Sequence, residues 1–431
     1  MPPTKSNIRP KPKAYNDHNV YILGAGFPAE AGLPLVKLFM NRMRDAVAWL
    51  EGQPGRDREV TAIERVLDFR LRAAAAAYRV PLDVENVEEL FSLASASEGG
   101  ELADDMALAI AATLDFAQND HIQNEASRPR EYRFYQVGVL DPSSWTKPTN
   151  WEPPLPQIEG SLKAGHAKGE WYSCPPYEYY VGIMGGYFNE PTRTRRDTLI
   201  TFNYDLTAEI ALRDLRIPFS YGLSGRSVNF GPGTSSLMLS EEYAPQSAPR
   251  VLKLHGSINW AIPGGVGQKL TFYKDYADLR EKRLTPVLVP PTWRKYFGGQ
   301  LSDVWDTAVR SLRTATRIVI LGYSIPQTDL HFKYLLATGL QDNISLRKIV
   351  FVNPDLAPPD QADPLKARLF GVLGEQHFRR DLIEFVPEKT SNFFHGPKDT
   401  TKHQLYRDSI GRPLPAFYTA ATSYMTFPPF F

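Results

Sequence analysis

The sequence predicts an α/β fold built on a mostly parallel sheet with helices on both faces, interrupted by a large, mainly helical insertion. Short apolar runs of β-type residues each end in glycine or polar residues, and helical segments fall between several of them. That alternation is typical of a parallel sheet covered on both faces. The first run lies near residue 20, whereas all the others follow residue 197, which indicates a long inserted segment between them.

The first strand is expected over Val20–Leu23, followed by a turn at Gly24. Apolar residues at helical spacing then predict four helices, over 36–50, 60–77, from Asn86 onward, and about 101–117. At the third helix, Asn86 as N-cap with Glu89 three residues later forms a variant capping box. The segment 127–195 is rich in Pro, Trp and Tyr without a clean period, so we expect it to be irregular and packed through its aromatic side chains.

Five further strands are predicted beyond residue 197. They are DTLITFNYD, RVLKLHGSINW, LTPVLVPPT, TRIVILGYS and RKIVFVNPD, with helical segments over 206–215, 302–316 and 331–340. The predicted organisation is a flexible segment at 1–17, a core formed by 18–34 and 196–390, a helical insertion at 35–195 and a tail at 391–431.

The composition excludes several classes of protein. With 49 Lys and Arg against 48 Asp and Glu, the net charge of +1 gives no overall footprint for direct binding of nucleic acid or of an anionic membrane. The one cysteine, Cys174, excludes a disulfide within the chain and a Cys-x-x-Cys zinc module. The start lacks the apolar core of a secretory signal, and no run reaches the ~18 apolar residues that span a bilayer, so we expect a cytoplasmic protein.

Small or polar residues follow five of the predicted strands. Because ligands of open α/β sheets bind outside the carboxyl ends of the strands, these residues are the candidates for a nucleotide site. They are Gly24, Ala25, Gly26 and Phe27 after the first strand, Asn203 and Asp205 after the second, His255 after the third, Gly322 and Ser324 after the fifth, and Asn353 after the sixth.

The glycine turn has two interpretations. Gly24 and Gly26 allow a sharp turn and close approach to a ligand, and the helix expected after Phe27, with Pro28 in its first turn, would point its N–H groups at an anion. The alternative is a tight strand-to-helix turn that binds nothing.

The polar strand ends also have structural alternatives. Asn203 can hydrogen-bond a ribose hydroxyl or a water, and Asp205 can accept from an amide, but Asp205 is equally suited to cap the next helix. His255 is placed for proton transfer, against the alternative of a core histidine with satisfied hydrogen bonds. His18 and His331 are weaker candidates, and we expect His331 to be structural or at the rim of the site.

Four segments, in this order, resemble the sirtuin-like family and most closely its bacterial branch of NAD hydrolases in anti-phage defence. They are GAGFPAEAGLP (24–34), TFNYD (201–205), LHGSINW (254–260) and LGYSIPQTDLHFKYLL (321–336), and NVEELFSLA (86–94) resembles a helix of that branch. The resemblance implies a Rossmann-like core and leaves most of 35–195 and the tail unmatched.

The resemblance implies a role for each candidate residue at an NAD⁺ site without metal. The glycine turn and the Gly322–Ser324 segment would face the phosphates, Asp205 the carboxamide and Asn353 the adenosine ribose, while Asn203 and His255 would be catalytic. Two residues depart from the family pattern: Phe202 replaces the glutamine of deacylating sirtuins, and Pro28 replaces a serine. No acidic residue is clearly assigned to the 2′-hydroxyl, for which Asp355 is a candidate.

The function that the resemblance implies is hydrolysis of NAD⁺ to nicotinamide and ADP-ribose, depleting NAD⁺ in abortive-infection defence. It also implies control by homo-oligomerisation or by a separate partner such as a HerA-like ATPase or a short Argonaute. One alternative is a catalytically silent module that senses NAD⁺ or ADP-ribose, which Pro28 favours. The other is a protein deacylase or ADP-ribosyltransferase, which the missing four-cysteine zinc module disfavours.

Overall fold

The computed structural model describes fifteen stretches of the chain, and all structural statements below concern those residues. They are 18–77, 79–80, 82–96, 101–127, 177–185, 197–214, 217–231, 234, 237–245, 248–264, 269–289, 301–326, 330–357, 359–373 and 382–395. The expected flexible segment 1–17, Cys174 and most of the C-terminal tail lie outside them.

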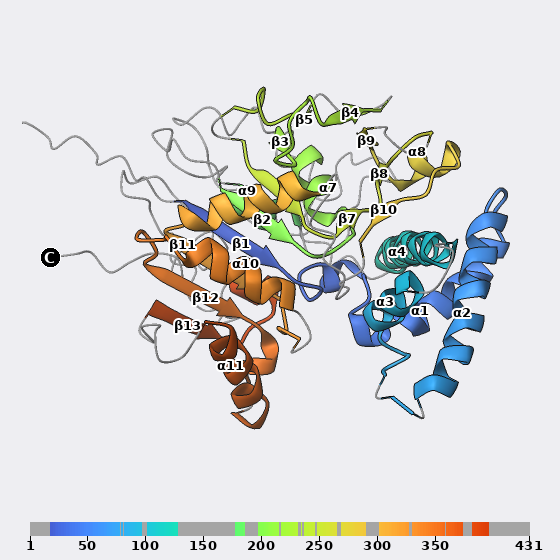
Figure 1. The fold of residues 1–431 in the computed structure, drawn as a ribbon, viewed down its shortest axis with the longest axis horizontal. Coiled ribbons are helices and arrows are strands. Elements are labelled where there is room, and N and C mark those ends of the chain that lie inside the picture. Colours follow the sequence, from blue (N-terminus) through green and yellow to red (C-terminus); the bar gives the residue numbers. More distant parts are fainter. Residues whose placement is uncertain are drawn as a thin grey trace, which may run out of the picture.

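An eight-stranded sheet in which every neighbouring pair is parallel forms the centre of the molecule (Figure 1). The α/β prediction is therefore confirmed. In spatial order the strands are β13 (Ile383–Val386), β12 (Lys348–Val352), β11 (Arg317–Leu321), β1 (Asn19–Leu23), β2 (Thr198–Thr201), β6 (Arg250–Lys253), β3 (Phe219–Ser220) and β5 (Met238–Leu239). The strand order reverses between β1 and β11, because β2, β6, β3 and β5 lie on one side of β1, and β11, β12 and β13 lie on the other.

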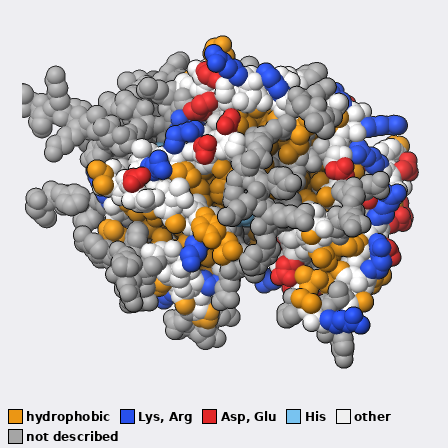
Figure 2. Space-filling view, viewed as in Figure 1, with side chains coloured by type: hydrophobic (Ala, Val, Ile, Leu, Met, Phe, Trp, Pro, Cys, Tyr) orange, Lys and Arg blue, Asp and Glu red, His pale blue; other side chains and the backbone are white. Residues whose placement is uncertain are grey.

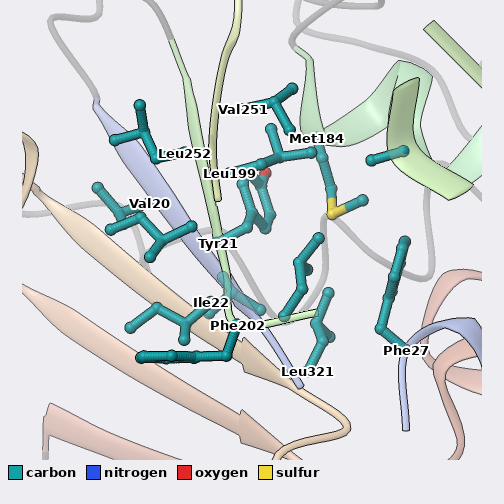
Figure 3. Packing of buried hydrophobic residues seen from close by; sticks show 14 of the residues in the cluster. Val20, Tyr21, Ile22, Phe27, Met184, Leu199, Phe202, Val251, Leu252 and Leu321 are labelled. Atoms are coloured by element: carbon teal, nitrogen blue, oxygen red, sulfur yellow. The ribbon is translucent and has the colours of Figure 1, made fainter. Parts of the chain in front are cut away.

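Helices cover both faces of this sheet, as its alternating side chains require. One face of the sheet carries the register neighbours Tyr21, Leu199 and Val251, which lie on the same side as Met184 of α6 (Tyr177–Met184) (Figure 3). The opposite face carries Val20, Ile22 and Leu252. Helices α9 (Ser302–Arg313) and α10 (Leu330–Leu340) lie side by side over one face in Figure 1. The other helices of this part are α7 (Thr207–Asp214), α11 (Pro359–Leu373) and α12 (Thr390–His395).

One predicted strand does not join the parallel sheet. The run LTPVLVPPT forms only β10 (Val287–Leu288), which pairs antiparallel with β7 (Gly256–Ser257), so its assignment to the parallel sheet is wrong. Prolines 286, 290 and 291 bracket it, and since proline has no N–H to donate they limit the pairing to two residues. A second small sheet contains β4 (Val228–Phe230), β8 (Trp260–Ala261) and β9 (Leu270–Phe272).

A helical region lies in sequence between β1 and β2 and has its own hydrophobic core. Its helices are α1 (Val36–Glu51), α2 (Asp57–Ala77), α3 (Val87–Ala96) and α4 (Glu101–Ser127). In Figure 1 this region lies beyond the carboxyl ends of the central strands. Its core also takes in Leu206 from the loop after β2, Ile258 directly after β7 and Ala261 of β8. The helical region therefore packs on the segments that follow β2 and β6 and carry candidate site residues.

The four helices were expected, but their details differ from the prediction. Asn86 caps α3 by accepting hydrogen bonds from the N–H groups of Glu88 (3.0 Å) and Glu89 (3.4 Å). The Glu89 carboxylate accepts from Asp83 N (2.9 Å), so the capping box is formed on one side only. Helix α4 runs ten residues past the predicted end, and α6 forms inside the segment expected to be irregular.

Charged side chains of both signs are interspersed on the face shown in Figure 2, in keeping with the near-zero net charge. Among the described residues, no helix is both long enough and apolar enough to cross a membrane. The structure also contains helix α8 (Tyr276–Glu281) and the short 3₁₀ helices η1 (Pro28–Ala31) and η5 (Pro354–Leu356).

Candidate functional site

The candidate residues lie at one edge of the sheet. They follow β12, β11, β1, β2 and β6, which are consecutive neighbours and all parallel, so their carboxyl ends point the same way. The turn after β1 and the loop after β11 flank the point where the strand order reverses. In open α/β sheets that point is where ligands bind.

The two glycine loops at this point are packed directly against each other. Gly24 N donates to Leu321 O (2.9 Å), and Gly26 N donates to Gly322 O (2.8 Å). A Cβ on Gly24 would lie 2.5 Å from Tyr323 Cα, and one on Gly322 would lie 2.4 Å from the Gly26 carbonyl carbon. The contact between the loops therefore explains these glycines without a ligand.

The segment after Phe27 differs from the expected helix N-terminus. Pro28 begins only the four-residue η1, and the long helix α1 starts at Val36, so the prediction of a helix aimed at an anion directly after Phe27 is wrong. The Phe27 side chain is buried against Tyr177 (ring centroids 5.2 Å apart), and Phe27 O accepts from the Tyr177 hydroxyl (2.5 Å). Phe27 is thus a core residue whose backbone closes the turn.

Asn203 connects the loop after β2 to the glycine turn. Its Nδ2 donates to Gly24 O (2.9 Å), and its backbone N donates to the Thr201 hydroxyl (3.0 Å). The side chain is half-buried, so it is held firmly but remains within reach of solvent. With Nδ2 engaged, the amide oxygen is the atom that would accept from a water or a ribose hydroxyl.

Two of the predicted binding residues have structural roles at this edge. Asp205 Oδ1 accepts from Thr207 N (2.8 Å) at the start of α7. Asp205 therefore caps this helix, which is the structural alternative that the sequence allows. The Asn353 amide accepts from Asp355 N (2.9 Å) and donates to Tyr323 O (3.2 Å). Ala25 and Gly322 are half-buried, and Ser324 is exposed.

His255 lies inside a cluster of aromatic rings. It is only 4% exposed, and its ring centroid is 5.1 Å from Phe202, 6.3 Å from Tyr204 and 6.1 Å from His331. His331 also contacts Trp305 (6.0 Å). An aromatic enclosure of this kind keeps bulk water away from the imidazole.

His331, which the sequence analysis expects to be structural or at the rim of the site, lies next to His255. It is half-buried in the first turn of α10, four residues before the buried Leu335. Residues four apart share a helix face, so the helical period contained the signal that His331 faces inward.

The Phe202 ring connects the loop after β2 with the loop after β11 and with α10. The ring stacks on Tyr323, which follows β11, with centroids 5.6 Å apart and an angle of 11° between the planes. It also meets Phe332 of α10 edge-on (6.2 Å).

Burial keeps the two tyrosines beside the site protonated. Burial is the main cause that raises the pKa of Tyr204 well above its usual value, and Glu88 of α3 adds to it. Burial likewise raises the pKa of Tyr177, with further contributions from Glu30 and Asp205. The Tyr204 hydroxyl accordingly donates to Val289 O (3.1 Å). Within the described part of the chain, no group of three or more His, Cys, Asp or Glu is placed to hold a metal ion.

The fold defines a doubly wound α/β protein with its candidate residues at the switch point. More particularly, residues 197–369 match the family model of the SIR2-like domain. The match includes the loops after β2, β6, β11 and β12 and leaves out the glycine turn after β1. No curated protein matches the chain.

Solved Sir2 structures align along most of the chain, at low similarity. A structure described as "Structural Basis for the Mechanism and Regulation of Sir2 Enzymes" is 13% identical, with 88% of this chain and 89% of that chain covered and a TM-score of 0.35. A Sir2 complex with a peptide and NAD⁺ is 13% identical, covers 87% and 90%, and has a TM-score of 0.32. A Sir2 homologue bound to ADP-ribose is 12% identical, covers 85% and 96%, and has a TM-score of 0.31. These values are too low to transfer the role of any residue.

Proposed function

We propose that this protein is an NAD⁺ hydrolase that cleaves the N-glycosidic bond to give nicotinamide and ADP-ribose. The observation that carries the proposal is the placing of Asn203 and His255. They follow the adjacent parallel strands β2 and β6, inside the part that matches a SIR2-like domain and next to the switch point. Solved Sir2 structures include complexes with NAD⁺ and with ADP-ribose.

The reaction suits the side chains at this edge. Water attacks C1′ of the nicotinamide ribose as the bond to the nicotinamide nitrogen breaks, through an oxocarbenium-like state. Nicotinamide leaves with the bonding electron pair as a neutral molecule, so no strong acid is required. The proton lost by water goes to His255 and then to solvent, and the Asn203 amide oxygen orients the water or a ribose hydroxyl.

The aromatic cluster supports this assignment physically. Phe202, Tyr204 and His331 surround the His255 ring, and the enclosure excludes bulk water while one water reacts. The exposed Ser324 and the half-buried Ala25 and Gly322 supply the accessible surface for the phosphates.

The biological role that we propose rests on sequence resemblance alone. Depletion of NAD⁺ would halt an infected cell in anti-phage defence, and unregulated depletion would be toxic to the host. The activity is therefore proposed to be controlled by self-association or by a separate defence partner. A HerA-like ATPase and a short Argonaute are the two kinds of partner to test.

A second function is sensing of NAD⁺ or ADP-ribose without turnover, which Pro28 favours because it replaces the serine of the family pattern. The N–H groups of Gly24, Gly26 and Phe27 all donate to protein carbonyls, and the Asn203 amide is also engaged. A phosphate would meet fewer donors in this arrangement than a phosphate-binding turn usually offers.

The test compares variants of the two catalytic candidates. NAD⁺ is incubated with the wild type, Asn203→Ala and His255→Ala, and nicotinamide is quantified together with ADP-ribose binding. The control is Asn343→Ala, because Asn343 also joins two loops, donating to Leu312 O (2.6 Å) and Ala315 O (2.9 Å), but lies just before β12.

Turnover that is lost in both site variants and kept by the control would support the hydrolase. Saturable ADP-ribose binding with intact NAD⁺, also after addition of either partner, would contradict it and support the sensor.

A further inference from the structure

A buried lysine lies two residues before His255. Lys253 is the last residue of β6 and is 0% exposed. Lysine is almost never fully buried unless its charge is paired, because removing an ammonium group from water is costly. The surroundings of Lys253 must therefore supply acceptors for its three N–H groups.

Three acceptors surround the ammonium group, and two of them belong to the loop that carries Asn203. Lys253 Nζ forms an ion pair with Glu209 Oε1 of α7 (2.9 Å). It also donates to Asp205 O and, at 3.4 Å, to Tyr204 O. One side chain thus connects the strand leading to His255 with the backbone just after Asn203.

Further buried hydrogen bonds hold the loop that carries Asn203. Ile258 N donates to Tyr204 O (3.1 Å), and Ser257 Oγ donates to Asn259 Oδ1 (2.6 Å). Asn259 Nδ2 in turn donates to the Tyr221 hydroxyl (3.3 Å). The network closes on the ion pair, because the Tyr221 hydroxyl also contacts Glu209 Oε1 (3.4 Å).

We propose that Lys253 is a positioning residue, which fixes the Tyr204–Asp205 backbone relative to His255 and so sets the geometry between Asn203 and His255. The catalytic part of this proposal rests on the proposed NAD⁺ hydrolysis. The competing view is that Lys253 and Glu209 form an ion pair that only stabilises the fold. The two views differ in what happens when both charges are removed together.

The test uses Lys253→Met alone and combined with Glu209→Gln. The single variant leaves a carboxylate buried without its cation and is expected to melt at least about 5 °C lower. The double variant has no unpaired charge and is expected to recover to within about 2 °C of the wild type. It still lacks the donors to Tyr204 O and Asp205 O, so its kcat for NAD⁺ is expected to stay at least about tenfold low with KM within about twofold.

Hydrogen exchange measures the positioning without depending on turnover. Peptides covering 202–207 are expected to exchange faster in the double variant than in the wild type. The control is Arg56→Met with Glu59→Gln and Asp115→Asn, which removes together the buried pair of Arg56 with Glu59 (2.9 Å) and its second pair with Asp115 on the α2 side of the molecule. This control is expected to leave both kcat and exchange at 202–207 unchanged.

The proposal would be overturned if the double variant has the same kcat as the wild type and the same hydrogen exchange at 202–207. If the wild type itself releases no nicotinamide, the proposed function fails, and exchange alone decides the positioning: faster exchange at 202–207 supports it, and unchanged exchange overturns it.

Discussion

Gly322 has a φ of 61° and faces the carbonyl carbon of Gly26 across the contact between the two loops. At the scale of single residues, glycines such as Gly322 determine whether this edge of the sheet can form. The sequence predicts that both glycine loops face a ligand. It does not reveal that they also pack against each other, because a Gly-x-Gly motif does not show which backbone it will contact.

Gly322→Ala is expected to lower the free energy of unfolding by about 2–4 kcal/mol. A Cβ is strained at positive φ and would also meet backbone atoms that cannot rotate away. Urea unfolding measures the change. Gly371→Ala in α11 is the control, because a Cβ there meets nothing within 4 Å and alanine favours a helix by up to about 1 kcal/mol. An equal effect of the two substitutions would contradict the account.

His331→Ala is expected to lower kcat/KM for NAD⁺ by about tenfold, with a loss of stability below about 1 kcal/mol. The ring lies between His255 and Trp305, so its loss frees the His255 ring to turn. Steady-state kinetics on folded protein measures the effect. The exposed Lys333 on the same helix provides the control, and Lys333→Ala should leave kcat/KM unchanged. Unchanged kcat/KM in His331→Ala would place this residue outside the site.

At the scale of elements, the long periodic segments were predictable and the short ones were not. The central strands β1, β2, β6, β11 and β12 are each four or five residues long and contain a run of apolar residues, so they stood out in the sequence. The two-residue strands β3 and β5 pair through too few residues to leave a pattern. The junction after Phe27 was mispredicted because Pro28 suits a 3₁₀ turn as well as an α-helix.

The start of α7 provides a test at this scale. Asp205→Ala is expected to cost about 1 kcal/mol of stability, because Thr207 N loses its acceptor, whereas Asp205→Asn keeps an oxygen there and should cost less than about 0.5 kcal/mol. Thermal unfolding of both variants measures this. If the carboxylate also contacts the carboxamide of NAD⁺, Asp205→Asn loses turnover while keeping its stability. Equal destabilisation by Asn and Ala would contradict the capping role.

At the scale of the whole molecule, the helical region and the sheet meet at the loops after β2 and β6. Leu206 and Ile258 from those loops belong to the hydrophobic core of α1 to α4. The sequence indicated that a helical segment separates the first strand from the others. It did not indicate that this segment packs on the site loops, because that contact joins residues far apart in the chain.

Ile258→Ala is expected to lower the free energy of unfolding by about 2–4 kcal/mol, since it removes a side chain only 4% exposed, and to lower kcat as well. Leu90→Ala in α3 belongs to the same core and should cost as much stability without lowering the kcat of folded protein. Chemical denaturation and turnover at a temperature where both variants are folded measure the two effects. Equal kcat in the two variants would show that the junction does not influence the site.

The central claim is that the edge carrying Asn203 and His255 hydrolyses NAD⁺. It is tested most directly by following NAD⁺ in ¹⁸O-labelled water with the wild type and His255→Ala, with and without a candidate partner. The account predicts equal amounts of nicotinamide and ADP-ribose from the wild type, with one ¹⁸O atom in each ADP-ribose, and a loss of at least about a hundredfold in His255→Ala. Intact NAD⁺ under all conditions, or cleavage that His255→Ala leaves unchanged, would contradict it.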